Sequence, residues 1–151
     1  MNRRTSSLRR ALAAGVAGFC AAAAPLAAQT DQDTGRALYE ANCAACHGAD
    51  LAGQPDWRTP GPDGILPAPP HDETGHTWHH GDGMLSAYVL DGASAVLGPA
   101  ASGFASGMPA FAGQLTKTEV TAILDYIKST WPPHIREVQA TRTQAETMKD
   151  Q

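Results

Sequence analysis

The stretch Cys43-Ala44-Ala45-Cys46-His47 decides the fold of this 151-residue chain. Two residues between the cysteines place both thiols on one helical turn, and the histidine that follows can reach a metal. Cys-x-x-Cys pairs in exported proteins also form disulfides or redox pairs, and with two further ligands they bind zinc. The chain has no second cysteine pair. The adjacent histidine therefore indicates covalent attachment of one haem c to Cys43 and Cys46, with His47 as an iron ligand.

The sequence around this motif resembles that of the small class I cytochromes c of bacteria, over most of residues 31–131. The resemblance rests on Gly35, on Tyr39, on Gly107-Met108-Pro109-Ala110-Phe111 and on Tyr126-Ile127. It implies an all-α fold of three or more helices and long loops wrapped around one haem, with crossed first and last helices that approach closely at Gly35. It also implies His47 as the proximal ligand, a methionine as the second axial ligand, and electron transfer as the function.

The residues themselves favour Met108 as that methionine. Met1 lies at the start of the chain, Met148 lies in a polar tail, and Met84 lies in a predicted helix where packing is the usual role. Met108 lies in an irregular segment, where the following proline restricts the backbone. Met84 or a histidine remains the alternative ligand. If Met108 only packs, the iron keeps an open position, which favours ligand sensing or peroxidase-like reactivity.

The N-terminal residues 1–28 read as a cleavable secretory signal. Four arginines precede an apolar run at residues 11–24, and small residues lead to a predicted cleavage after Ala28. The apolar run is shorter than the roughly 20 residues of a membrane span, and it ends at Pro25. We therefore expect export to the bacterial periplasm, with no membrane span after cleavage.

The charge of the mature chain restricts its partners. The signal holds four of the 11 lysines and arginines and none of the 15 aspartates and glutamates, which leaves seven against 15, a net charge of −8. This charge argues against nucleic acid and favours redox proteins with a basic docking surface. The carboxylates show no catalytic spacing, so we expect no enzyme activity. The alternatives are a haem subunit of a larger oxidoreductase, or a metal-handling or sensing haem module.

Helical periodicity and end signals predict helices over residues 33–43, 82–92 and 116–131. Asp33 and Asp82 are the expected caps of the first two helices, and Thr116 with Glu119 forms a capping box for the third. The intervening residues 53–75 and 93–113 are rich in small and helix-breaking residues, which predicts irregular loops.

Three parts of the chain follow from these features. They are the signal at residues 1–28, a monohaem cytochrome c domain at 29–133, and a polar tail at 134–151. We expect the tail to be a solvated helix or disordered, and dispensable for folding.

Four of the six histidines, His71, His76, His79 and His80, crowd into one segment that the family pattern does not explain. If residues 76–80 form a helical turn, three of these histidines share a face, a spacing that suits copper or zinc. The favoured alternative is a structural role or hydrogen bonds to the haem propionates, and a third is an axial histidine that displaces Met108.

Other polar groups are expected around the haem. The second ring N–H of His47 should donate to a backbone carbonyl, and residues 67–70 are the candidate source of that carbonyl. Trp57, Trp78 and Tyr88 either bind the propionates or simply pack, and packing is favoured.

Overall fold

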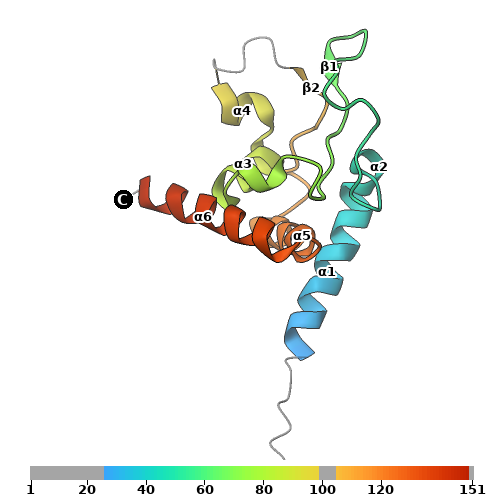
Figure 1. The fold of residues 1–151 in the computed structure, drawn as a ribbon. Coiled ribbons are helices and arrows are strands. Elements are labelled where there is room, and N and C mark those ends of the chain that lie inside the picture. Colours follow the sequence, from blue (N-terminus) through green and yellow to red (C-terminus); the bar gives the residue numbers. More distant parts are fainter. Residues whose placement is uncertain (1–25, 99–104, 150–151) are drawn as a thin grey trace, which may run out of the picture.

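A computed structural model describes residues 26–98 and 105–149. Its elements are α1 (Leu26–Asn42), α2 (Ala44–His47), β1 (Ile65–Leu66), the 3-10 turn η1 (Thr77–His79), α3 (Asp82–Asp91), α4 (Ala93–Leu97), β2 (Ala105–Ser106), α5 (Lys117–Ser129) and α6 (Pro133–Lys149). Residues 1–25 of the predicted signal lie outside the described part of the chain. The predicted all-α fold is confirmed, since helices dominate and each strand has two residues (Figure 1).

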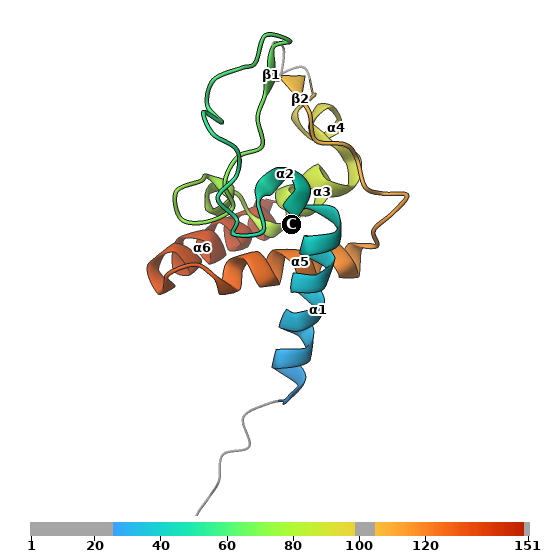
Figure 2. The ribbon, with the colours of Figure 1, turned by 90° about the vertical axis from the view of Figure 1, so that its right-hand side faces the viewer.

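The crossing of α1 and α5 organises the fold (Figure 2). A Cβ atom on Gly35 of α1 would collide with the carbonyl oxygen of Ala122, and it would lie 3.1 Å from the Cβ of Tyr126. Only glycine permits this approach of the two helices, as the resemblance to the class I cytochromes c implies. The inner face of α5 is apolar at helical spacing and buried, and it consists of Val120, Ile123, Leu124 and Ile127.

The hydrophobic core lies around this crossing and extends to Ile135 of α6. Tyr39 of α1 and Val120 of α5 are its fully buried members. Leu51, Phe111, Leu115, Trp131 and Ile135 join them from the loops and from α6. Burial of this apolar surface is the main driving force for the crossed arrangement.

One of the three predicted helix caps is confirmed. Thr116 Oγ1 accepts a hydrogen bond from Glu119 N, and Glu119 Oε2 accepts one from Thr116 N, at 3.3 and 2.8 Å. The predicted cap at Asp33 is wrong, because α1 already begins at Leu26. Leucine, alanine and glutamine favour helix through this lead, so the predicted cleavage point after Ala28 falls in the first turn of α1.

Asp82 also differs from its prediction. It is the first residue of α3 and makes no cap hydrogen bond from its own side chain, since Gly81 occupies the cap position. Its carboxylate is instead bound by Lys128 of α5 and Gln139 of α6. The tertiary partners outcompete the local cap.

The described residues of the two predicted loops are mostly irregular, and residues 99–104 of the second loop lie outside the described part of the chain. Residues 53–75 are irregular apart from β1, which pairs in parallel with β2 at Ile65–Ala105 and Leu66–Ser106. Within the predicted loop 93–113 the short helix α4 forms, because its alanine-rich sequence is helix-favouring and is bounded by glycines at both ends. The paired strands connect the long loop to the segment before Met108.

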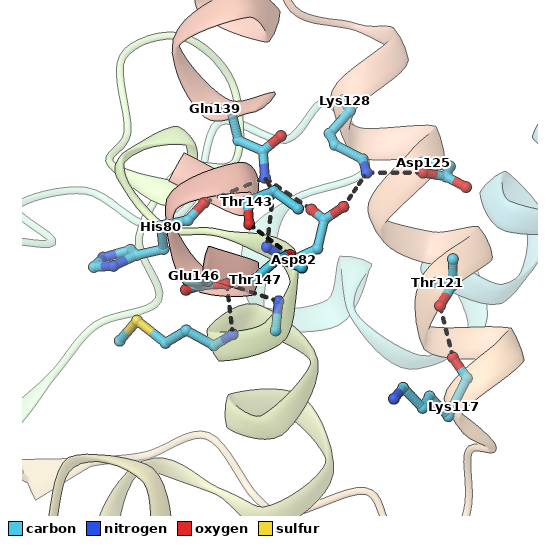
Figure 3. A network of polar contacts seen from close by, with 12 residues as sticks. His80, Asp82, Lys117, Thr121, Asp125, Lys128, Gln139, Thr143, Glu146 and Thr147 are labelled. Carbon is cyan, nitrogen blue, oxygen red and sulfur yellow. Dashed lines mark hydrogen bonds and ion pairs between the residues drawn. The ribbon is translucent and has the colours of Figure 1, made fainter. Parts of the chain in front are cut away.

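Helix α6 is more than a solvated tail. Ile135 and Gln139 are 7% and 3% exposed, and the helix contacts η1 and α3. Gln139, Thr143 and Glu146 bind the start of α3 (Figure 3). Residues 133–149 form a helix, which is one of the two predicted alternatives. Among the described helices, none combines the length and the hydropathy needed to cross a membrane.

Candidate haem site

Cys43 lies between α1 and α2, and Cys46 lies within α2. Cys43 N donates to Tyr39 O at 2.8 Å, and His47 N donates to Cys43 O at 3.0 Å, so the helical path continues through the motif. The buried Tyr39 hydroxyl donates to Gly48 O at 2.8 Å and holds the end of the turn against α1. This anchoring fixes the motif to the helix crossing.

Both thiols are free in the structure, Cys43 half-buried and Cys46 exposed. Burial, with a smaller effect from Cys46, raises the pKa of Cys43 to about 11. This direction is opposite to the depressed thiol pKa that reactive redox pairs carry. Two unpaired thiols on one turn next to a histidine suit thioether attachment.

His47 is oriented by a backbone carbonyl. Its side chain is buried, and Nδ1 donates to Pro69 O at 2.8 Å. This confirms the predicted carbonyl from residues 67–70 and leaves Nε2 for a metal. Burial lowers the pKa of His47, and the hydrogen bond to Pro69 acts in the opposite direction. The neutral imidazole is the form that binds metals.

The position of Pro69 depends on the loop that follows the motif. Gln54 N donates to Ala68 O at 2.8 Å, which lays residues 51–54 beside the proline run. Gly53 adopts a φ of 69°, and a Cβ atom there would lie 2.5 Å from Pro70 N. Positive φ and close contact both require glycine at this position. The carbonyl that orients His47 is therefore held by local backbone packing.

The family model for cytochrome c matches residues 32–131, more than half of the chain. The chain belongs to the cytochrome c family. Searches of curated protein sequences and of solved structures found no match. Cytochromes c bind haem c covalently and transfer electrons, and the thiols of Cys43 and Cys46 with the free Nε2 of His47 form a donor set that fits this group.

In this cytochrome the segment that carries Met108 is fixed by three kinds of contact. Met108 N donates to Ser106 Oγ at 3.2 Å, and Ser106 lies in the strand pair. Phe111 N and Ala112 N donate to carbonyls of α3 at 3.0 Å. The Met108 side chain packs against the same core that contacts Cys43. The partly buried side chain of Met108 therefore contacts the interior of the domain.

Met84 lies in a different environment. Its backbone N–H is 3.4 Å from Glu146 Oε2, and the residue lines a cavity between α3 and α6 together with Thr143 and Thr147. The residues that line this cavity therefore come from α3 and the C-terminal helix α6. The predicted packing role of Met84 fits this place, and Met108 remains the predicted iron ligand.

The histidine-rich segment contains a short turn, η1, and two of its histidines stack on tryptophan rings. The ring of His76 stacks on Trp57 at a centroid distance of 5.4 Å, and the ring of His79 stacks on Trp78 at 3.7 Å. Across residues 26–98 and 105–149, no group of three or more His, Cys, Asp or Glu could hold a metal ion. His76 and His80 lie in edge contact, with ring centroids 5.7 Å apart, and the second-metal alternative stays a prediction.

His71 and His80 also find protein partners. His71 Nδ1 forms a 2.8 Å hydrogen bond with Thr77 Oγ1, and burial holds the pKa of His71 well below its ordinary value. The half-buried His80 contributes its carbonyl oxygen to Gln139 at 3.2 Å. The ring of His71 stacks on that of His47, a contact that sequence reasoning missed. Its one signal was the position of His71 just after the proline run.

The other aromatic residues make their contacts within the protein. Trp78 Nε1 donates to Glu73 O and the Tyr88 hydroxyl donates to Ser106 Oγ, both at 3.3 Å. The guanidinium of Arg58 lies 4.0 Å from the centre of the Trp57 ring, a cation–π contact. A propionate role for these residues and for the histidines stays a prediction.

Proposed function

We propose that this cytochrome is a periplasmic carrier of single electrons, with one haem c attached to Cys43 and Cys46 and with His47 and Met108 as axial ligands. The observation that carries the proposal is the hydrogen bond from His47 Nδ1 to Pro69 O, which leaves Nε2 as the free ring nitrogen beside two unpaired thiols. The chain has one Cys-x-x-Cys-His motif, which supports one haem.

A methionine as the second ligand supports electron transfer without an enzyme activity. The haem supplies the one-electron couple of its iron, and a histidine–methionine ligand pair raises its potential and leaves no position for substrate. The role of Met108 is supported by its contact with the core and by the separate environment of Met84. This cytochrome therefore acts as a carrier that docks with redox proteins.

Mass spectrometry of the purified mature protein tests the attachment. We expect one haem in addition to the chain, retained after acid-acetone extraction. Cys43→Ser/Cys46→Ser should lose this mass, whereas Ala45→Ser, which adds a hydroxyl between the cysteines and keeps both thiols, should retain it. Haem extracted by the solvent from the unmodified protein would refute covalent attachment.

The acidic mature chain supports a basic docking partner and the signal-like residues 1–28 support export. Electron exchange with a basic redox protein should be faster than with an acidic one of similar potential, and the difference should shrink as salt is added. Cell fractionation should place the haem-containing protein in the periplasm, and deletion of residues 2–24 should leave a cytoplasmic protein without haem. Equal rates with both partners would contradict the docking proposal.

A further inference from the structure

The ring of His71 lies flat against the ring of His47. Their centroids are 4.0 Å apart and their planes differ by 22°. This is a stacked contact between two imidazoles, closer than the edge contact of 6.3 Å that His71 makes with Tyr39. A residue of the histidine-rich segment thus covers one face of the proposed iron ligand.

His71 is itself held on three sides. Its N–H donates to Leu51 O at 2.8 Å, and its carbonyl accepts a hydrogen bond from Trp131 Nε1 at 2.7 Å. Its ring is bound to the buried Thr77 hydroxyl. Leu51 and Trp131 are 4% and 3% exposed, so these partners belong to the rigid core. The ring of His71 therefore has little freedom to follow a movement of His47.

The ring of His47 is therefore constrained in two ways, by a hydrogen bond and by a stacked ring. The hydrogen bond to Pro69 O fixes the direction of Nδ1, and the stacked ring opposes a tilt of the imidazole plane. We propose that His71 is a positioning residue, which holds the plane of the His47 ring and so sets its orientation at the haem iron. This inference rests on the proposed function, because it takes His47 as an axial ligand.

A packing role alone makes a different prediction. A side chain that merely fills space can be replaced by another of similar volume, whereas a ring that orients its neighbour requires a flat surface. His79 offers the matched control, because its ring also stacks at 3.7 Å, but on Trp78, and its side chain is exposed. The loss of His79 removes an imidazole stack without touching His47.

The experiment uses the full-length holoprotein with His71→Ala, His71→Phe, His71→Leu and His79→Ala. The readouts are the electron paramagnetic resonance of the ferric form and the hyperfine-shifted proton resonances of the haem methyls, both of which respond to the plane of an axial histidine. Outer contacts tune a metal through the orientation of its ligands. We expect shifted g values and a changed spread of methyl resonances in His71→Ala and His71→Leu. His71→Phe should restore both signals, and His79→Ala should leave them unchanged.

Two results would overturn the proposal. One is a low-spin spectrum in His71→Leu that matches the unmodified protein, and the other is a His71→Phe spectrum as altered as that of His71→Leu. The leucine and phenylalanine variants decide the matter even if His71→Ala does not fold, since both fill the space. Failure of the proposed function is separate, because His47→Gly would then retain the axial-ligand signals of the unmodified protein.

Discussion

Gln139 Nε2 donates a 2.7 Å hydrogen bond to Asp82 Oδ1, and this contact joins α6 to the first residue of α3. Asp82 Oδ2 accepts a second bond, at 2.9 Å, from Lys128 of α5. Asp82 thus lies between two C-terminal helices (Figure 3). Glu146 Oε2 further accepts a bond from Gly83 N at 3.0 Å, so α6 satisfies donors at the start of α3.

Replacement of Gln139 by alanine should destabilise the protein, contrary to the prediction that the tail is dispensable. Loss of the amide removes the donor to Asp82 Oδ1 and to the His80 carbonyl oxygen, which costs about 1–3 kcal/mol. The free energy of unfolding of the holoprotein, from denaturant titration, measures the effect. Gln144→Ala, at an exposed position of the same helix, is the control. Equal stability of the two variants would show that α6 adds nothing through this contact.

Gly35→Ala should be strongly destabilising, because its Cβ would meet the Ala122 carbonyl at the crossing of α1 and α5. Overpacking of this kind costs about 1–3 kcal/mol or more. Thermal unfolding followed by circular dichroism is the measurement. Gly113→Ala serves as the control, since a Cβ there meets nothing within 4 Å. A Gly35→Ala protein as stable as Gly113→Ala would mean that the helices can separate without loss.

Met108→Ala and Met84→Ala should have different effects on the haem. We expect Met108→Ala to lose the sulfur-to-iron charge-transfer band, to lower the potential and to admit carbon monoxide. Met84→Ala should keep the spectrum and lose some stability, since Met84 borders the cavity between α3 and α6. A reduced-minus-oxidised titration distinguishes the two. The reverse pattern would reassign the ligand to Met84.

Acid should destabilise the protein through His76 and His80. Desolvation lowers the pKa of each ring, aided at His76 by Arg58 and opposed at His80 by Glu146. The unfolded chain titrates near 6.5, so it takes up protons before the folded protein does. Stability is therefore full above about pH 6.5 and falls as the pH drops through the lower folded-state values.

The test compares unfolding at neutral and mildly acidic pH for His76→Gln/His80→Gln and the unmodified protein. The double variant should lose less stability on acidification. His134→Gln, which changes an exposed histidine of α6, is the control. An unchanged pH dependence in the double variant would place the acid sensitivity elsewhere in the chain.

Several features could be predicted from the sequence because they are encoded within a few residues. The spacing of Cys43, Cys46 and His47 forms one helical turn, and Thr116 with Glu119 caps α5 across three residues. Such patterns depend on backbone geometry that repeats every turn, so neighbours in the sequence suffice to predict them.

The tertiary structure decided the contacts between segments that are distant in the chain. Residues 67–70 offered several carbonyls, and only the packing of Gly53 against this run selects Pro69 for His47. The stack of His71 on His47 depends on the same return of the chain. The polar composition of α6 suggested a solvated tail, but Gln139 is buried because Asp82 satisfies its amide. A polar side chain can be buried only where a partner satisfies it, and the fold alone supplies that partner.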